Sequence, residues 1–420
     1  MVNHLDCPST RSLGVQMAAK NPQDRNLDRI DRRSFLRLGV AASGFAIGCG
    51  PSGGEAAEDT GTGEMRYRPL GNTGLRVSEI SFGTGTAGVP NPDMVLAALE
   101  AGINTISTSD SAAYGRSEEL IGEAIRTSAG SRDRLVLLTG GIIRPGSTKR
   151  SILDGIEASL RRLRTDRVEI YCAANVGSPD DLRIGVLFEA FEEARKAGKV
   201  LHLGLSGHRG GMQDCLNAAI DDGRFEVFFT KYDFISYPDQ DRILRRATER
   251  GIGTIVFKTN AGNRQKEVKD LEAGGLSFQQ ATWKWALTNP NVASVAVTLT
   301  NFDQIRECTA AVGSTLTRPE QGMLRRYRDE MTDKYCRFCG TCEASCPHDV
   351  AVAEVMRYAM YFKYYGREKE AMQLYRALPE RCSAVTCASC PAPCAAGCPF
   401  GRGVHAELVE AHRLLTISGA

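Results

Sequence analysis

The sequence predicts an α/β barrel of eight strand-and-helix units, followed by a smaller, cysteine-rich helical domain. Two observations carry this prediction. Short β-branched runs alternate with amphipathic runs from Arg66 to about Gly313, and nine of the 14 cysteines fall between Cys336 and Cys398. A chain of 420 residues, 42% of them hydrophobic, is long enough to bury the cores of two such domains.

Residues 1–49 are predicted to be a signal region for twin-arginine export. Arg32 and Arg33 precede a short apolar stretch at 38–48, and this arrangement resembles the twin-arginine signal. That route carries folded proteins, so the mature chain is expected in the periplasm or another extracytoplasmic space.

The end of this region leaves two questions open. The stretch from Ala46 to Cys49 resembles a lipoprotein cleavage box, which makes Cys49 a candidate for lipidation; the alternative is an ordinary cleavage region of small residues. Met1 and Met17 are both candidates for the first residue. Residues 50–64 are polar and predict a flexible linker to the barrel.

The barrel is predicted to occupy residues 65–316. Helical stretches at 151–163 and 181–197 are examples of the runs that separate its strands. In such a barrel the active site lies at the carboxyl ends of the strands. The candidate strands are 79–83, 103–107, 134–139, 168–173, 200–205, 225–230, 252–258 and 293–298.

The tail, residues 317–420, contains two patterns typical of iron–sulfur ligands. The first has the spacing of bacterial ferredoxins, in which three cysteines hold one [4Fe-4S] cluster and the fourth reaches a second cluster. This predicts two sets of ligands, and a small α-helical ferredoxin-like domain with helices at 317–334, 350–366 and 367–378. One set is Cys336, Cys339, Cys342 and Cys398, and the other is Cys346, Cys387, Cys390 and Cys394.

Zinc sites and structural disulfides are the alternatives for these cysteines. Three closely spaced thiols followed by Cys-Pro are unusual for zinc, and neighbours two or three residues apart rarely reach the geometry of a disulfide. Cys382 is left over, and a register in which it replaces Cys387 stays open. Cys172, Cys215 and Cys308 lie in apolar segments and are expected to be core thiols.

Several stretches together resemble the aldo/keto reductase family. They are YRPLGNTGLRVSEISFGTGTAG from Tyr67, AGINTISTSDSAAYGRSEELIGEAI from Ala101, SILDGIEASLRRLRTDRVEIY from Ser151, GLSGH from Gly204, and the helix around Trp283 with the NPNVASV that follows it. The resemblance covers residues 66 to about 315, and the tail resembles that of members with a fused ferredoxin-like module. It implies a (β/α)8 barrel and an oxidoreductase.

The family reduces carbonyl groups with a tyrosine acid, a lysine, an aspartate and a histidine. Of these four positions the resemblance retains only the tyrosine, Tyr114; the aspartate, lysine and histidine positions hold Ser107, Gly140 and Ala174. Without a neighbouring cation, a phenol with a pKa of about 10 is a weak acid at neutral pH. Asp110 lies nearby in sequence but is displaced from the family position.

The nucleotide site implied by the resemblance is altered as well. Ser206 and Phe257 are retained as candidates to hold the nicotinamide of NADP(H), but the positions that bind the 2′-phosphate hold Thr298, Leu299 and Gln304. Binding of NADP(H) is therefore left open.

Other polar residues follow predicted strands and are expected to converge on the mouth of the barrel. His208 is the best of these, since a histidine with a pKa of about 6.5 can act as an acid unaided. Asn175, Lys231, Tyr232 and Lys258 are further candidates, and for the two lysines and the tyrosine the alternatives are solvated caps and packing.

Three functions are consistent with these features. The favoured one is an exported oxidoreductase that binds a small organic substrate at the barrel mouth and passes electrons through two [4Fe-4S] clusters to or from a partner protein, with Tyr114 and His208 handling protons. A non-catalytic electron carrier or scaffold and an NADPH-dependent carbonyl reductase are the alternatives. The near-balance of 52 Lys and Arg against 50 Asp and Glu, without a basic run, excludes nucleic acid as an expected partner. A membrane is expected only through a lipid anchor, because no apolar run is long enough to span one.

Overall fold

The computed structural model describes residues 64–85, 88–111, 114–127, 130, 132–143, 146–174, 176–207, 211–235, 240–262, 271–272, 277–331 and 335–416. The predicted signal region with Cys49, and the candidates Asn175 and His208, lie outside the described residues.

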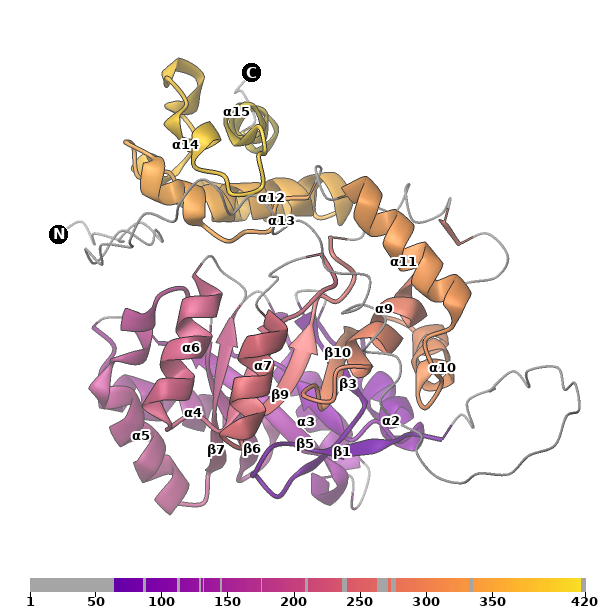
Figure 1. The fold of residues 1–420 in the computed structure, drawn as a ribbon. Coiled ribbons are helices and arrows are strands. Elements are labelled where there is room, and N and C mark those ends of the chain that lie inside the picture. The colour runs from indigo at the N-terminus through magenta and orange to yellow at the C-terminus, as the bar shows by residue number, and fades with distance from the viewer. Residues whose placement is uncertain are drawn as a thin grey trace, which may run out of the picture.

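Eight parallel strands close into a barrel with the order β10-β3-β4-β5-β6-β7-β8-β9 (Figure 1). Each of them overlaps one of the predicted strands, so the prediction of eight strand-and-helix units is confirmed. The strands are β3 (Ile80–Gly83), β4 (Thr105–Ser107), β5 (Val136–Ile142), β6 (Val168–Ala174), β7 (Val200–Gly207), β8 (Val227–Lys231), β9 (Gly253–Phe257) and β10 (Ser294–Thr298).

Successive side chains along each strand point to opposite faces, and this divides the apolar core of the barrel into two clusters. In β6, Ile170 and Cys172 belong to the cluster of side chains that fills the barrel, whereas Tyr171 and Ala173 belong to the larger cluster between strands and helices. A parallel strand covered on both faces needs apolar residues at both odd and even positions, which explains why these strands are almost continuously apolar.

A ring of helices covers the outside of the barrel (Figure 1). Local caps begin several of them: Asn91 accepts from the backbone N–H of Met94, and Thr148 forms a reciprocal capping box with Ser151. The helices are α2 (Pro92–Glu100), α3 (Ser117–Thr127), α4 (Lys149–Leu163), α5 (Gly185–Lys196), α6 (Met212–Asp222), α7 (Gln240–Glu249), α9 (Phe278–Leu287) and α10 (Phe302–Ala311), with short 3-10 turns at Arg132–Arg134 (η3) and Pro179–Leu182 (η4).

An N-terminal hairpin precedes the barrel. Its strands β1 (Tyr67–Pro69) and β2 (Arg76–Ser78) pair antiparallel, and Leu70 and Val77 join the side chains inside the barrel. Arg68 anchors the hairpin through an ion pair of 2.7 Å with Glu79.

Helix α11 (Arg318–Met331) connects the barrel to the tail. Its 14 residues span about 21 Å at 1.5 Å per residue, and it rises from the side of α9 and α10 toward the carboxyl ends of the strands (Figure 1). A nearly buried ion pair of 2.8 Å between Lys284 of α9 and Glu320 fixes its lower end. The helix expected over 317–334 is therefore present, and 332–334 are outside the described residues.

The tail is a helical layer over the mouth of the barrel (Figure 1). The two helices expected between the cysteine patterns are α12 and α13, whereas the last helix, α15, was not among the expectations. The tail contains η5 (Thr341–Ser345), α12 (Val352–Tyr364), α13 (Glu368–Arg376), η6 (Glu380–Cys382), η7 (Cys387–Ser389), α14 (Pro393–Ala396) and α15 (Val404–Leu415).

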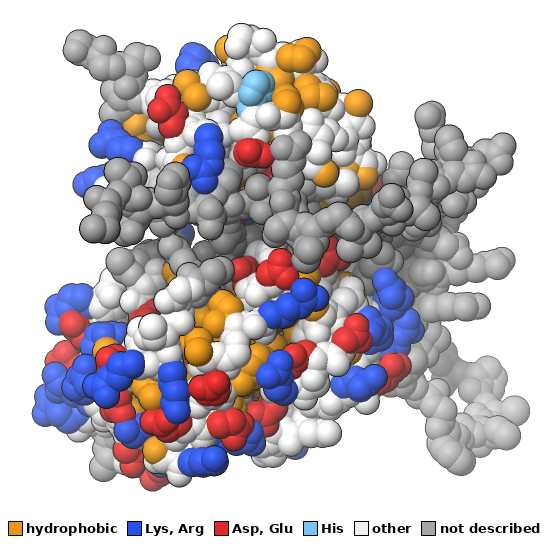
Figure 2. Space-filling model, turned by 90° about the vertical axis from the view of Figure 1, so that its left-hand side faces the viewer, with side chains coloured by type: hydrophobic (Ala, Val, Ile, Leu, Met, Phe, Trp, Pro, Cys, Tyr) orange, Lys and Arg blue, Asp and Glu red, His pale blue; other side chains and the backbone are white. Residues whose placement is uncertain are grey.

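The tail shares its apolar core with the top of the barrel. One cluster of buried side chains includes Phe278 of α9, Tyr327 of α11 and Val355 of α12. On the face shown in Figure 2, acidic and basic side chains are interspersed over the barrel, and hydrophobic side chains gather on the upper part of the tail. Within the described residues, no helix combines the length and apolarity that a membrane span requires.

Candidate functional site

The strand ends at β4, β5 and β6 carry the positions where the family resemblance places aspartate, lysine and histidine. Ser107 closes β4, Gly140 pairs in register with Cys172, and Ala174 closes β6. Because Cys172 faces the barrel interior, its register partner Gly140 faces the interior too. The three positions thus lie where catalytic side chains would reach the mouth, yet none carries a titratable group.

Tyr114 precedes α3 and is largely buried beside β6. Burial, and next the charge of the neighbouring Cys172, raise the pKa of its phenol above the usual value of 10.0. A raised pKa makes Tyr114 a still weaker acid at neutral pH, which agrees with the expectation for a phenol without a neighbouring cation.

Packing of the neighbouring strand excludes a side chain at Gly140. A Cβ atom there would lie 2.3 Å from the carbonyl oxygen of Cys172 and 3.0 Å from its Cβ. The first distance is to backbone atoms of a central strand, which cannot move aside cheaply. A lysine at this position, where the resemblance places the family's lysine, would therefore clash with β6.

Asp110 does not restore the missing aspartate. A Cβ at Gly141 would meet the hydroxyl of Tyr171 at 2.7 Å and a carboxylate oxygen of Asp110 at 3.2 Å. Gly141 follows Gly140 and faces the other side of the strand, so Asp110 lies toward the outer layer. Burial and the charge of Glu118 raise its pKa, and the guanidinium of Arg162 opposes them. Asp110 therefore belongs to the ionic network behind β5, where Arg162 pairs with Glu118 at 2.6 Å.

The candidate nucleotide positions are partly occupied by structural contacts. Ser206 lies in β7, and Phe257 ends β9 with its ring 4.6 Å from that of Phe229. Gln304 accepts a hydrogen bond of 2.6 Å from the backbone N–H of Thr300, so it is used to shape the start of α10. No phosphate partner replaces the missing basic residue among these positions.

Tyr232 proves to be a packing residue. Its ring stacks on that of Trp285 at 4.7 Å, and its hydroxyl donates to Asp241 at 2.5 Å. It faces the layer between strands and helices, away from the mouth, as the packing alternative predicts.

The two lysines at the ends of β8 and β9 contact the tail directly. Lys231 donates to the hydroxyl of Tyr335 at 2.9 Å and pairs with Asp233 at 3.1 Å. Lys231 and Asp233 are 3% and 0% exposed, so the pair is fully within the junction between barrel and tail. Neither lysine is therefore a solvated cap at a strand end.

Lys258, just past the end of β9, makes the second contact. It donates to the hydroxyl of Tyr361 in α12 at 3.1 Å. Burial above all, and then the charges of Arg357 and Lys231, lower the pKa of Lys258 well below its usual 10.5, while Glu354 opposes them. Its backbone has a φ of 58°, a left-handed conformation that is uncommon for residues other than glycine.

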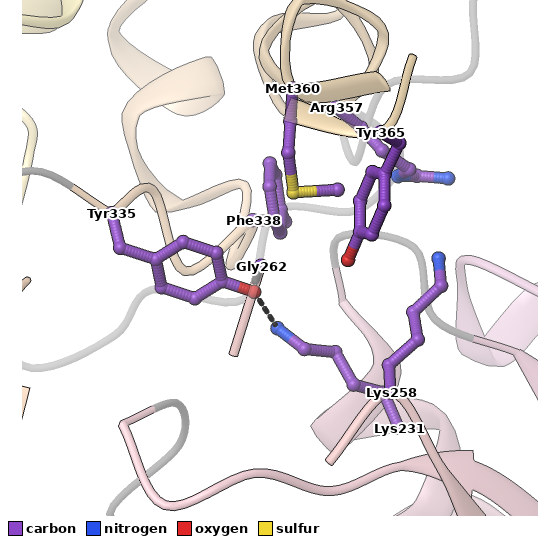
Figure 3. Close-up of a pocket in the computed structure, with 8 residues that line it drawn as sticks. All are labelled: Lys231, Lys258, Gly262, Tyr335, Phe338, Arg357, Met360 and Tyr365. Atoms are coloured by element: carbon purple, nitrogen blue, oxygen red, sulfur yellow. Dashed lines mark hydrogen bonds between the residues drawn. The ribbon is translucent and has the colours of Figure 1, made fainter. Parts of the chain in front are cut away.

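A small cavity lies between these contacts. Figure 3 shows Lys231 reaching Tyr335, and Lys258 pointing from the strand end toward Arg357 and Tyr365. The free volume, about 10 Å³, is of the order that one water molecule needs. The cavity is lined by Lys231, Lys258, Gly262, Tyr335, Phe338, Arg357, Met360 and Tyr365.

Gly262 allows the tail to approach the barrel this closely. Its φ is 87°, and a Cβ there would lie 2.6 Å from the ring of Tyr335. Arg357 forms a buried ion pair with Glu354 on the facing side of the cavity. The junction is therefore a buried site rich in charges and phenols, built from both parts of the chain.

Eight of the nine tail cysteines lie in two groups of interacting thiols. Charge interactions join Cys342 to Cys336, Cys339 and Cys398. A second set joins Cys387 to Cys346, Cys390 and Cys394. The assignment of these two groups as ligand sets of two clusters stays a prediction. All eight are free thiols, so none is in a disulfide.

The chemistry of these thiols fits a metal cluster. Burial first, and neighbouring thiols next, raise the pKa of Cys387 to about 12 and that of Cys342 still further. Thiols brought together in this way gain from a cation that binds their thiolate form. Among the described residues, no three His, Cys, Asp or Glu side chains converge tightly enough for a single metal ion. A four-iron cluster is wider than a single ion, so its four sulfur ligands would lie further apart than those of one ion. The identity of the metal stays a prediction.

Sequence reasoning missed the tail's contribution to the mouth. Tyr335, Asp233, Arg357 and Tyr361 were not among the candidates. A usable signal was the pair of lysines following adjacent strands, because a buried lysine at a strand end requires a partner. Nothing in the sequence identified that partner as a tyrosine roughly a hundred residues away.

Comparison with known proteins identifies the barrel. The profile of the aldo/keto reductase family matches residues 79–269, which excludes the tail. The 6-dehydroglucose reductase of Novosphingobium aromaticivorans is 33% identical over 261 residues, covering 53% of this chain and 83% of that protein. The oxidoreductase YrpG of Bacillus subtilis is 26% identical over 313 residues, covering 62% of this chain and 95% of YrpG.

A solved structure shows the same barrel fold. The aldo-keto reductase AKR11C1 from Bacillus halodurans, in its holo form, matches with a TM-score of 0.53 and 23% identity, over 63% of this chain and 96% of its own. The match to the 6-dehydroglucose reductase, together with the family profile, identifies the chain as a member of the aldo/keto reductase family and an oxidoreductase.

Proposed function

We propose that this oxidoreductase transfers single electrons to or from a small organic molecule bound at the barrel mouth, through two [4Fe-4S] clusters in the tail. The observation that carries the proposal is the packing of two four-thiol groups directly above a family barrel whose strand ends lack three of the four catalytic side chains. A barrel without these side chains cannot supply the family's usual acid catalysis. Its connection to a proposed redox module favours an electron source other than NADPH.

The residues of the chain would divide the work as follows. Cys336, Cys339, Cys342 and Cys398 would hold one cluster, and Cys346, Cys387, Cys390 and Cys394 the other. Such clusters supply one-electron transfer at potentials set by burial and hydrogen bonding to the sulfurs. Phe338 donates its backbone N–H to the sulfur of Cys336 and would contribute to this tuning.

The first cluster would lie close to the junction cavity. Tyr335 precedes Cys336 in the chain, and its hydroxyl accepts from Lys231 at the mouth. Substrate protons would be handled by Tyr114, and by His208, which lies outside the described residues. The proposal includes twin-arginine export of the folded, metal-loaded chain and an electron-transfer partner protein.

An experiment on Tyr114 tests the proton-handling role. Anaerobic protein is assayed with a reduced dye as electron donor and a panel of small aldehydes and sugars as acceptors. If Tyr114 is the acid, Tyr114→Phe should lower turnover by about 10²–10⁴-fold. Tyr67→Phe, at an exposed residue of the hairpin, is the control and should keep full turnover. Unchanged turnover in Tyr114→Phe would remove this role.

NADPH-dependent carbonyl reduction is the second candidate, because the family match and the retained Ser206 and Phe257 favour it. A fluorescence titration with NADPH distinguishes the two. Binding at micromolar concentrations, followed by hydride transfer in the absence of iron, would support the second candidate over the first.

A further inference from the structure

Arg402 is the first charged residue after a long uncharged stretch of the tail. Residues 382–401 include the second cysteine pattern and contain no Asp, Glu, Lys or Arg. Arg402 follows Cys398 by four residues, and the backbone N–H of Gly401 donates to the carbonyl oxygen of Cys398 at 3.1 Å, which closes a turn between them. The side chain of Arg402 is only 5% exposed, so this turn places its charge inside the tail.

The guanidinium of Arg402 forms an ion pair with Glu407 of α15. The two partners differ in exposure, since 30% of the Glu407 side chain is accessible to solvent. Water therefore screens the carboxylate more than the guanidinium. The positive charge of this pair is the one that acts on the interior of the tail.

That positive charge reaches the first group of thiols. Burial is the main influence on the Cys336 thiol and raises its pKa to about 12. Among the charges around Cys336, Arg402 acts most strongly and lowers the pKa, whereas Glu407 raises it by less. A cation that favours the thiolate of Cys336 also favours any other negative charge at the same place.

A buried carboxylate acts on the same group in the opposite direction. Glu343 is 4% exposed, and its charge, together with burial and the thiol of Cys336, raises the pKa of Cys342. Its position is fixed, because it accepts a hydrogen bond of 2.8 Å from the backbone N–H of Ala353 in α12. The field at the first group thus depends on a cation that opposes Glu343.

The second group of thiols has different surroundings. Burial, and then neighbouring cysteines, raise the pKa of Cys387 and of Cys394. Backbone N–H groups donate to sulfurs in both groups, from Phe338 to Cys336 and from Ala395 to Cys394, so these hydrogen bonds do not distinguish them. The buried guanidinium does distinguish them.

A charge of this kind changes a redox potential. A [4Fe-4S] cluster gains one negative charge when it is reduced, so a nearby cation stabilises the reduced form more than the oxidised form. Because the guanidinium is buried, solvent and salt screen this effect only weakly.

We propose that Arg402 raises the reduction potential of the first cluster, the one nearer the barrel mouth, and so favours electron transfer from the second cluster toward the mouth. This inference rests on the proposed function, because it requires the clusters. In the transfer step the second cluster loses one electron and the first cluster gains it. The electron enters from the partner protein of the proposed function. Arg402 acts through its charge and is a positioning residue.

A redox titration of full-length protein, purified without oxygen, tests the proposal. Electron paramagnetic resonance follows the reduction of each cluster, and Cys342→Ser and Cys346→Ser assign the signals to the first and second cluster. Arg402→Gln should lower the equilibrium constant for reduction of the first cluster at least about tenfold, a shift of about 59 mV for one electron. The potential of the second cluster should change much less.

Glu407→Gln provides a test with the opposite sign. It removes the negative partner and leaves Arg402 in place, so it should raise the potential of the first cluster. Arg402→Lys keeps the charge and should restore most of the potential that Arg402→Gln loses. An ion pair that only fixes the start of α15 would not give shifts of opposite sign when its two partners are removed in turn.

Arg413→Gln is the matched control. Arg413 is exposed in the last turn of α15, so its removal takes the same charge from the surface of the same helix and should leave both potentials unchanged. If Arg402→Gln protein loses its iron, the direction of the Glu407→Gln shift decides: a rise supports the proposal, and no rise overturns it.

The outcome is separable from that of the redox proposal. Iron-loaded protein in which both substitutions leave the first potential unchanged, or move it in the same direction, would overturn the role of Arg402 and leave the electron-transfer function standing. Full-length protein without iron would overturn both.

Discussion

The two sides of the barrel mouth differ in chemistry. At the ends of β4, β5 and β6, the positions to which the resemblance assigns the family's catalytic groups hold Ser107, Gly140 and Ala174, and the packing excludes a larger residue at Gly140. At the ends of β8 and β9, Lys231 is buried and Lys258 is partly buried, and each donates a hydrogen bond to a tyrosine of the tail. The two sides therefore differ in what lies over them: small residues line the ends of β4, β5 and β6, whereas the tail contacts lysines at the ends of β8 and β9.

The largest effect is expected from breaking the thiol groups of the tail. Cys342→Ser should remove about half of the iron and destabilise the tail, because a missing thiolate leaves one set of four incomplete. Since Cys398 belongs to the same group, Cys398→Ser should alter the same electron paramagnetic resonance signal as Cys342→Ser. Cys346→Ser should alter the other signal.

The control for this experiment is Cys215→Ser at a buried thiol of α6, which should leave the iron content unchanged. If Cys342→Ser and Cys346→Ser affected the same signal, the exchange of ligands between the two sequence patterns would be wrong.

The next effect concerns the small residues at the ends of β4, β5 and β6. Gly140→Lys, which would restore the family lysine, should lower the free energy of unfolding by about 3 kcal/mol, because its Cβ would meet the Cys172 carbonyl. Urea denaturation measures this. Gly155→Ala in α4 is the control, since a Cβ there meets nothing within 4 Å, and it should stabilise by about 0.5–1 kcal/mol. A stable Gly140→Lys variant with carbonyl reductase activity would contradict the steric exclusion.

A smaller effect is expected where the tail meets the barrel. Gly262→Ala would push its Cβ against the ring of Tyr335 and should destabilise by about 1–3 kcal/mol. Gly366→Ala is the matched control, because Gly366 also has a positive φ, 61°, but open space around it, so only backbone strain is added. Hydrogen exchange should show loosening of α12 in the first variant only. Equal effects of the two changes would mean that the close approach at Gly262 does not matter.

The smallest effect is a gain. The pKa of Lys258 is lowered in the folded state, so burying its charge costs stability at every pH below the folded value. That cost decreases as the pH rises from the folded pKa toward 10.5 and is absent above it. Lys258→Met should therefore raise the free energy of unfolding at pH 7 by about 1 kcal/mol, after the loss of the Tyr361 hydrogen bond is subtracted.

Denaturation of Lys258→Met at several pH values measures this gain, which should fade toward pH 10.5. A destabilised variant at pH 7 would show that Lys258 is favourably paired.

The sequence was most informative where structure depends on neighbours along the chain. The eight strands and helices α4, α5 and α11 to α13 follow from local periodicity, and the positions of Ser107, Gly140 and Ala174 follow from the resemblance. The steric exclusion at Gly140 depends on the register between β5 and β6, which no local pattern reveals.

The junction was beyond sequence reasoning for a similar reason. Lys231 and Lys258 were candidates, but their partners Tyr335 and Tyr361 are 104 and 103 residues further along the chain. Such contacts depend on how α11 returns the tail to the mouth. The energies of these contacts arise from burial and charge at the junction. Neither the burial nor the charge environment can be assigned before the barrel and the tail are placed together.

The most direct test of the redox account is the metal content of full-length protein purified without oxygen. The account predicts brown protein with about eight iron atoms and about eight acid-labile sulfides per chain, whose visible absorbance bleaches on reduction. Colourless protein that contains zinc, or no metal at the eight tail cysteines, would contradict it.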